Sequence, residues 1–416
     1  MKLLVVVNVF RPDLGGGVLF SDLCYGLAAR GFDVTVRCAY PYYPEWTDKT
    51  GRNGLAIARY EEEGVHVERF GIYIPRNPNS LAERLVYEAS FFASLARRLP
   101  RRGEFDLVMA FCPLVGAVAY GALVRRLAGC PLWLNVQDLS ADAAAAGGIA
   151  RGAAAVRLMS GTQNTLFNQA DVWSTIAPVM ADRLAQLRRR EQPIHLLPNW
   201  LHATLADALA ALPSKAGRLP ARPVRLLYSG NVGSKQDLLR LCRALQASEA
   251  PFTFRIQAGG SRAAEVRDWV AATADARFTF HELTDEAGLA RALHETDFFV
   301  VTEKSGSGGS FIPSKLIPGM ASGTPILAVC DAGSPLGREM ERSQPGPRFD
   351  WSDAEGPARL LAGITAAPEP FAAWQRHALA RARDFEREHV IDRYARAIRA
   401  AVAGTPYEDV SETTDE

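Results

Sequence analysis

Short apolar runs alternate with Ala-, Leu- and Arg-rich stretches along almost the whole chain, and this alternation constrains the fold more than any other feature. The runs are continuously apolar, which is typical of strands buried on both faces of a parallel sheet. A first series covers 3–9, 34–38, 65–70, 107–111, 132–136, 172–176 and 195–197, and a second covers 224–228, 253–257, 277–280, 298–301 and 326–329. A single sheet of that width would be unusual, so the sequence predicts an α/β protein of two doubly wound, Rossmann-like domains.

The length of 416 residues also exceeds one ordinary hydrophobic core. Prolines interrupt the chain around 198–221, so we expect a linker there, an N-terminal domain at 1–200 and a C-terminal domain at 221–380. The last long helical region is expected over roughly 371–402. We predict that its part 381–402 crosses back to the N-terminal domain, and that the acidic residues 403–416 form a flexible tail.

Charge and cysteine usage exclude several functions. The formal net charge of +1 argues against nucleic-acid binding through a basic surface. The six cysteines stand alone, which favours buried thiols in a reducing compartment over disulfides or a zinc site. The seven histidines show no metal-binding spacing, so we expect no metal and no cofactor. With no signal-peptide pattern and no apolar run of membrane-spanning length, a cytoplasmic location is expected.

Three glycine-containing turns follow predicted strands, where open α/β sheets bind ligands. The first holds Gly15, Gly16 and Gly17 ahead of a helix and lacks the GxGxxG spacing of dinucleotide enzymes. The second, which contains Gly230, Asn231, Gly233, Ser234 and Lys235, combines amides with an ammonium group at the start of a helix. This combination favours a pyrophosphate, although a solvated surface lysine is the alternative. The third turn contains Gly259 and no charge of its own.

The segment 303–316 carries the densest set of candidate ligand-binding residues. Its Gly/Ser loop closes on a Pro-Ser-Lys sequence at the start of a helix and so offers amides, hydroxyls and a cation. A purely structural loop seldom needs so many glycines beside two lysines, which favours a function. The candidates are Gly308, Gly309, Ser310, Phe311, Ile312, Pro313, Ser314 and Lys315.

Together these residues resemble glycosyltransferase family 4 of the GT-B fold, and in particular the bacterial enzymes similar to colanic acid and O-antigen fucosaminyl transferases. The resemblance spans nearly the whole chain. The matching segments occur in the family's order, at 30–36, 41–44, 136–139, 197–200, 228–231, 313–316 and 320–325. Each motif is weak alone, whereas the ordered series is specific.

The resemblance implies transfer of a sugar, with retention of anomeric configuration, from a nucleotide diphosphate-sugar such as a UDP-sugar. The acceptor would be a glycan or a polyprenyl-diphosphate-linked sugar in polysaccharide biosynthesis. It implies donor binding mainly by the C-terminal domain and no required metal. By matching positions, Lys235 and the loop ending at Lys315 hold the donor phosphates, and the turn at 15–17 approaches the donor from the other side. Gln137, Asp138 and Ser310 are the expected catalytic positions.

The chain departs from the family in its carboxylates. The two glutamates of the family's Glu-x7-Glu pattern align with Ser310 and Pro318 of this chain. The family also has an arginine before the phosphate-binding lysine, and this chain has Ser234 at that position. Proline has no side-chain acceptor, so its ribose contact is lost or supplied elsewhere. Two alternatives therefore stay open: a sugar-nucleotide 2-epimerase of the same fold, and a non-catalytic relative that binds a nucleotide sugar or a partner.

Apolar residues recur near helical spacing between 81 and 102, with arginines beside them. Such a helix can lie in the headgroup region of an anionic membrane, which predicts peripheral attachment to the inner membrane leaflet. The alternative is an amphipathic helix packed on its own sheet with solvated arginines.

Overall fold

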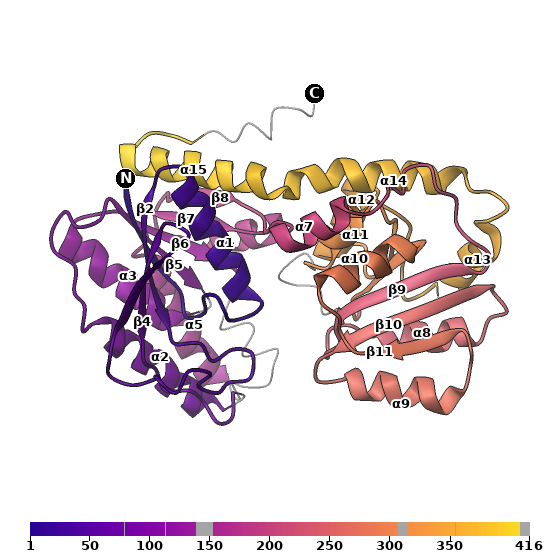
Figure 1. The fold of residues 1–416 in the computed structure, drawn as a ribbon, viewed down its shortest axis with the longest axis horizontal. Helices are drawn as coiled ribbons and strands as arrows, with labels where there is room; N and C mark the ends of the chain where they lie inside the picture. The colour runs from indigo at the N-terminus through magenta and orange to yellow at the C-terminus, as the bar shows by residue number, and fades with distance from the viewer. Residues whose placement is uncertain (79, 113, 139–152, 307–313, 354, 408–416) are drawn as a thin grey trace. The chain divides into compact units, whose positions relative to one another are not determined.

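The computed structural model describes residues 1–78, 80–112, 114–138, 153–306, 314–353 and 355–407, with the side chains of 153–159 not included. The chain divides into two compact units (Figure 1). Unit 1 comprises Met1–Pro198 together with Val390–Glu416, and unit 2 comprises Asn199–His389. Each unit contains one parallel or largely parallel sheet with helices packed on it, so the α/β class and the doubled strand–helix series are confirmed.

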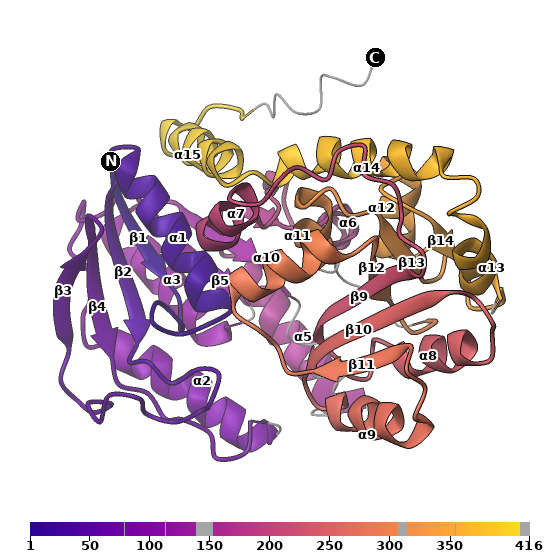
Figure 2. The same cartoon turned by 45° about the vertical axis from the view of Figure 1, so that its right-hand side comes forward.

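Unit 1 has an eight-stranded sheet in the order β3-β4-β2-β1-β5-β6-β7-β8, and the first four strands of that order are seen side by side in Figure 2. Every neighbouring pair is parallel except β3 and β4. The strands are β1 (Lys2–Val6), β2 (Asp33–Ala39), β3 (Ala58–Glu62), β4 (Val65–Phe70), β5 (Leu107–Cys112), β6 (Leu132–Val136), β7 (Val172–Thr175) and β8 (Ile194–Leu196). The central strands are mostly apolar because helices cover both faces, and all six residues of β5 are buried.

The helices of unit 1 are α1 (Gly16–Ala29), α2 (Leu81–Leu95), α3 (Val115–Ala128), α5 (Ala153–Phe167), α6 (Pro178–Leu187) and most of α15 (Arg387–Ala403). Although α15 follows unit 2 in sequence, it is bonded to unit 1. Tyr394 Oη accepts a hydrogen bond from Asn135 Nδ2 at 2.7 Å, and Arg393 donates to the carbonyl of Leu196 at 2.7 Å. The C-terminal helix is therefore an integral part of unit 1.

Unit 2 has a six-stranded, fully parallel sheet in the order β11-β10-β9-β12-β13-β14. The strands are β9 (Val224–Asn231), β10 (Phe252–Gly259), β11 (Phe278–His281), β12 (Phe298–Thr302), β13 (Ile326–Val329) and β14 (Arg348–Phe349). Alternate residues of one strand enter different cores. Phe298 and Val300 of β12 pack into one hydrophobic cluster, and Phe299 and Val301 pack into another on the opposite face.

The helices of unit 2 are α7 (Ala203–Ala210), α8 (Leu238–Gln246), α9 (Ala263–Thr273), α10 (Glu286–Glu295), α11 (Leu316–Ala321), α12 (Pro335–Ser343), α13 (Gly356–Gly363), α14 (Glu369–Ala382) and the 3-10 helix η1 (Arg383–Phe385). Residues of α8, α9 and α13 enter the first cluster, residues of α10, α11 and α12 enter the second, and α14 contributes to both. Both faces of the sheet are thus covered.

Two local expectations were wrong, and one strand was not predicted. The region 198–221 contains the helix α7, and the helical region expected over 371–402 is interrupted by η1. The sequence also gave no sign of β3, whose residues are mostly exposed and polar because it is an antiparallel edge strand.

Candidate functional site

The strand order of unit 2 places a ligand crevice between β9 and β12. The chain winds outward from β9 through β10 to β11 and then returns to β12 on the other side of β9. Such a reversal leaves a crevice beyond the carboxyl ends of the two central strands, which is the usual ligand site of an open α/β sheet. The turn after β9, the segment after β12 and the start of α11 all lie at this edge.

Lys315 is the best-defined cation at this edge. Its ammonium group donates a hydrogen bond to Tyr228 Oη at 2.8 Å and lies 4.2 Å from the centroid of the same ring. Tyr228 in turn donates to the carbonyl of Asn231 at 2.7 Å. Burial lowers the pKa of Lys315 to about 8. Gly230 has a φ of +135°, which favours glycine, and a Cβ there would lie in ordinary contact with Lys315 Cε and Nζ at 3.5 Å.

The turn that contains Lys235 is fastened to the end of β12. The carbonyl of Lys235 accepts a hydrogen bond from the amide of Lys304 at 2.7 Å. Gly233 N donates to Gln236 Oε1 at 2.8 Å, and Ser234 is exposed at the tip of the turn. This arrangement brings the second predicted turn and Lys315 to the same edge of the sheet.

The third predicted turn packs against the second. Val232 N donates to the carbonyl of Gly259 at 2.8 Å. A Cβ at the neighbouring Gly260, whose φ is +100°, would lie 1.8 Å from Asn231 Oδ1. Only glycine permits this approach. Of the predicted loop, Ser314 is exposed, whereas Gly308, Gly309, Ser310, Phe311, Ile312 and Pro313 lie outside the described residues.

In unit 1 the first glycine turn follows β1 and leads into α1, which begins at Gly16. Gly15 has a φ of +63°, and a Cβ there would lie 3.7 Å from the Tyr43 ring. A Cβ at Gly17 would lie 2.9 Å from Asp13 Cβ, so this glycine accommodates the fully buried Asp13. Packing against Tyr43 and Asp13 is therefore one reason why this turn contains glycines.

Asp13 is a residue that sequence reasoning missed. Its Oδ1 accepts hydrogen bonds from the amides of Tyr42 at 3.0 Å and Tyr43 at 2.9 Å, and so ties the turn after β1 to the segment after β2. Burial raises the pKa of Asp13, although these two amides act to lower it. An aspartate between a proline and glycines reads as an ordinary turn residue, so nothing in the sequence indicated this role.

Gln137 and Asp138 follow β6, at the carboxyl edge of the unit 1 sheet. Gln137 Nε2 donates to Asn135 Oδ1 at 2.7 Å, and Asn135 Nδ2 donates to Ser174 Oγ and Tyr394 Oη. The carbonyl of Asp138 accepts a bond from Cys112 Sγ at 3.2 Å. The amide group of Gln137 is thus oriented by a hydrogen-bonded chain that reaches α15.

An aromatic cluster adjoins this edge of unit 1. Tyr42 and Tyr87 share a hydrogen bond of 2.6 Å between their hydroxyls, and Asn8 Nδ2 donates to both at 2.7 Å. The Trp46 ring lies 5.4 Å from that of Tyr42 and 5.8 Å from that of Tyr87, measured between centroids. Trp46 has a φ of +55°, which is uncommon for a bulky residue. The ring contacts of Trp46 with Tyr42 and Tyr87 hold the backbone in this conformation.

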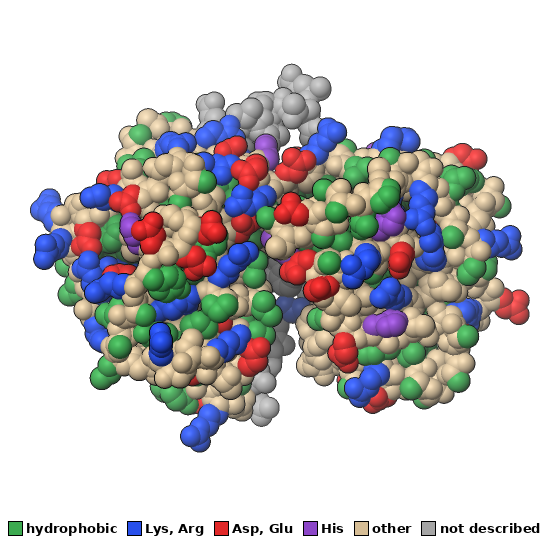
Figure 3. All heavy atoms as spheres, in the orientation of Figure 1, with side chains coloured by type: hydrophobic (Ala, Val, Ile, Leu, Met, Phe, Trp, Pro, Cys, Tyr) green, Lys and Arg blue, Asp and Glu red, His purple; other side chains and the backbone are tan. Residues whose placement is uncertain are grey.

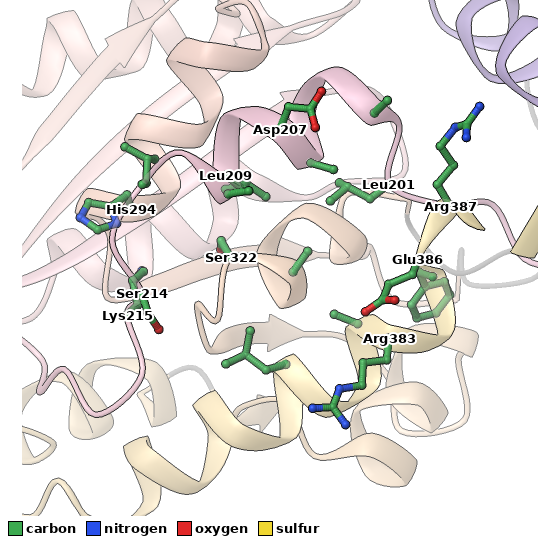
Figure 4. Close-up of a pocket in the computed structure, with 18 of the residues that line it drawn as sticks. Leu201, Asp207, Leu209, Ser214, Lys215, His294, Ser322, Arg383, Glu386 and Arg387 are labelled. Atoms are coloured by element: carbon green, nitrogen blue, oxygen red, sulfur yellow. The ribbon is translucent and has the colours of Figure 1, made fainter. Parts of the chain in front are cut away.

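Unit 2 also contains a cavity of about 720 Å³ (Figure 4). Its lining includes Ser322 at the far end of α11 from Lys315, so the cavity is distinct from the crevice between β9 and β12. Lys215 lines it, in the segment that the sequence indicated as a loop. Its ammonium group donates to the carbonyl of Leu293 at 2.8 Å and to Thr324 Oγ1 at 2.7 Å, and burial lowers its pKa to about 7. Here the lysine serves to cap the end of α10.

Among the residues that the structure describes, no group of three or more His, Cys, Asp or Glu side chains could hold a metal ion. A search of the same residues finds no helix with the length and apolar character to cross a membrane. On the face drawn in Figure 3, Lys and Arg side chains are interspersed with Asp and Glu. All six cysteines lie in the described part of the chain, where they are buried and form no disulfide.

Residues 15–200 match the family described as Glycosyl transferase 4-like domain. A protein of Escherichia coli (strain K12) named as a colanic acid biosynthesis glycosyl transferase, WcaI, is 28% identical over 379 residues, which cover 88% of this chain and 92% of that protein. The solved structure of sucrose-phosphate synthase from Thermosynechococcus elongatus is similar with a TM-score of 0.69 and 17% identity, over 97% of this chain and 100% of that one.

Anabaena HepE, solved in complex with UDP and glucose, is similar with a TM-score of 0.64 and 16% identity, over 96% of this chain and 100% of that one. At these identities the structural likeness shows the fold, which is GT-B. The matched family and the named relative are both described as glycosyltransferases. The chain is therefore a glycosyltransferase with the GT-B fold, and its residues 15–200 match the family described as Glycosyl transferase 4-like domain.

Proposed function

We propose that this glycosyltransferase moves a sugar from a UDP-sugar, with retention of anomeric configuration, to a glycan or polyprenyl-diphosphate-linked acceptor in polysaccharide biosynthesis. The similarity to a relative named for colanic acid biosynthesis supports the polysaccharide acceptor. The UDP and glucose bound to Anabaena HepE support the donor class. We assign donor binding to unit 2, and Gln137 and Asp138 to contact with the transferred sugar.

The observation that carries this proposal is the placement of Lys235 and Lys315 at the crevice between β9 and β12. A departing nucleoside diphosphate gains negative charge as the glycosidic bond breaks. Fixed ammonium groups and backbone amides can stabilise that charge because they are oriented before the reaction begins. We propose that these groups, with no metal or cofactor, neutralise the leaving diphosphate.

A ligand screen followed by a turnover assay tests the function. We expect UDP to raise the thermal unfolding temperature of the full chain more than uridine does, because the diphosphate provides the charge that the lysines bind. One UDP-sugar should release UDP when a polyprenyl-diphosphate-linked acceptor is added. Stabilisation by GDP or ADP in place of UDP would contradict the donor assignment.

The absence of carboxylates from the family's Glu-x7-Glu positions favours a second candidate, a relative that binds without turnover. Pro318 lies within α11 and cannot accept a hydrogen bond from a ribose through its side chain. Stabilisation by UDP and UDP-sugars without release of UDP in the presence of acceptors would support this candidate. Conversion of a UDP-sugar without an acceptor would instead indicate an epimerase.

We also propose that α2 attaches unit 1 to an anionic membrane. Its buried residues Tyr87, Phe91 and Leu95 pack on the unit, whereas Leu85 and Val86 are 57% and 51% exposed. The helix thus packs on its own unit and still presents apolar side chains outward. It ends at Leu95, so the predicted extent to 102 was too long. Exposed arginines beside an apolar surface favour anionic headgroups.

Vesicle flotation measures this attachment. We expect the chain to float with vesicles containing about 30% phosphatidylglycerol and to remain unbound with pure phosphatidylcholine, because arginines near an anionic surface are attracted to it. Replacing Leu85 and Val86 together by glutamine should reduce the bound fraction severalfold, since apolar burial is lost. The matched control replaces Leu219, an apolar residue of unit 2 that is 60% exposed. Equal binding by wild type and the α2 variant at 150 mM salt would contradict the proposal.

A further inference from the structure

Glu303 lies directly after β12, at the crevice between β9 and β12. Two backbone bonds fix its position. The following amide, of Lys304, donates to the carbonyl of Lys235, and Trp351 Nε1 donates to the Glu303 carbonyl at 2.6 Å. The backbone at Glu303 is consequently held beside the turn to which we assign the donor phosphates, and the carboxylate lies near enough to Lys235 to interact with its charge.

One oxygen of this carboxylate, Oε2, is buried and has no hydrogen-bond partner among the described residues. The side chain as a whole remains partly exposed. Burial raises the pKa of Glu303, and Asp331 acts in the same direction, whereas the Ser334 hydroxyl and Lys235 act to lower it. A carboxylate oxygen that is buried without a hydrogen-bond donor costs the folded protein free energy. A bound hydroxyl group would donate to that oxygen and so relieve the cost.

The neighbouring carboxylate behaves differently. Asp331, after β13, accepts hydrogen bonds from the amide of Gly306 at 2.7 Å and from Ser305 Oγ at 3.1 Å. It therefore has a structural role in holding the segment after Glu303. Ser310 and Pro318, which align with the family's two glutamates, have no carboxylate. Glu303 is thus a carboxylate at this edge that has a buried oxygen left to bind a ligand.

We propose that Glu303 is a donor-binding residue of this chain, whose carboxylate accepts a hydrogen bond from a hydroxyl group of the nucleotide sugar. A hydroxyl group is favoured over a phosphate because a carboxylate repels phosphate oxygens, which the nearby Lys235 attracts. The hydroxyl can come from the ribose or from the transferred sugar. This inference rests on the proposed donor site and assigns to Glu303 a carboxylate contact that neither Ser310 nor Pro318 can make.

Binding of UDP, 2′,3′-dideoxy-UDP and UDP-glucose, measured by isothermal titration calorimetry on the full chain, distinguishes the two sources. If the ribose is the partner, Glu303→Met should weaken UDP binding about tenfold or more, the scale of a hydrogen bond to a charged group, and leave dideoxy-UDP binding unchanged. If the transferred sugar is the partner, UDP binding stays unchanged and UDP-glucose binding falls by that factor. Either result supports the inference.

Equal weakening of all three ligands, or no change in any, would overturn the inference. If the wild type still binds UDP, such a result would leave the proposed function supported. A wild type that binds none of the three ligands would overturn both. Glu303→Gln keeps the side-chain shape and a neutral acceptor, so it should show a smaller, severalfold loss of affinity for the same ligands. This variant replaces Glu303→Met in the experiment if the methionine variant does not fold. Glu249→Met, an exposed position just before β10 at the other end of the sheet, is the matched control and should bind all ligands normally.

Discussion

Replacing Arg37 by methionine is expected to destabilise unit 1 by about 3 kcal/mol, because the change leaves a buried carboxylate with too few partners. The Arg37 side chain is 1% exposed and donates to Glu68 Oε2 at 2.7 Å, to the carbonyl of Arg98 at 2.8 Å and to the Tyr120 hydroxyl. In the variant, Arg59 and Arg98 would still lie near Glu68. The expected loss of unfolding free energy is therefore at the lower end of the range for breaking a buried ion pair. Pulse proteolysis in urea, with the fragments identified by mass spectrometry, measures the unfolding of unit 1 specifically.

Arg59 provides the matched control for this prediction. It donates to the same carboxylate at 2.9 Å, but its side chain is 59% exposed, so Arg59→Met should cost less than about 1 kcal/mol. Equal losses for the two variants would contradict the importance of burial.

The contribution of the Arg37–Glu68 ion pair to the stability of unit 1 also depends on pH. Burial would raise the pKa of Glu68, but Arg37 and the neighbouring arginines lower it below its usual value. A lowered folded-state pKa stabilises the fold above the unfolded pKa, and this contribution is lost as the pH falls through the folded value. The Arg37 variant should therefore lose less stability than wild type on acidification.

Lys315→Ala is expected to weaken UDP binding by ~1.5–3 kcal/mol, or roughly 10- to 150-fold, without unfolding unit 2. A charge-assisted bond to the diphosphate is lost, while the Tyr228 hydroxyl keeps its bond to the Asn231 carbonyl. Lys235→Ala should have an effect of the same size. Isothermal titration calorimetry with UDP measures both. Unchanged affinity in both variants would remove the phosphate site from the crevice between β9 and β12.

The pH profile separates Lys315 from Lys235. Since burial lowers the pKa of Lys315 to about 8, its ammonium form is present below that pH and is lost above it. Wild-type affinity for UDP should therefore fall as the pH rises through about 8, and Lys315→Ala should show a flatter profile over the same range. A wild-type affinity independent of pH between 7 and 9 would contradict this role.

The parallel sheets could be predicted because strands covered on both faces leave continuous apolar runs, as in β5 and β12. The same rule cannot detect β3, which is exposed, or β14, which has only two residues. The predicted turns after β9 and β10 come together because carboxyl ends of parallel strands share one edge of a sheet.

Burial of charged side chains could not be predicted in the same way. Asp13 and Lys215 are buried by elements distant in sequence, and only tertiary packing reveals their partners. One overlooked signal was the scarcity of lysine. Arginine greatly outnumbers it in this chain, and the few lysines are Lys2, Lys49, Lys215, Lys235, Lys304 and Lys315. Two of these lysines, Lys235 and Lys315, lie at the candidate donor site, where a flexible point charge suits a phosphate.

The contribution of α15 to unit 1 has a consequence for biosynthesis. Unit 2 is contiguous in sequence, so all its residues are synthesised before the last segment of unit 1, Val390–Glu416. During that interval Asn135 lacks the Tyr394 hydroxyl that it bonds in the finished protein. The N-terminal unit is thus the last to be completed, and a stop codon after residue 389 would spare unit 2 while damaging the unit that is translated first.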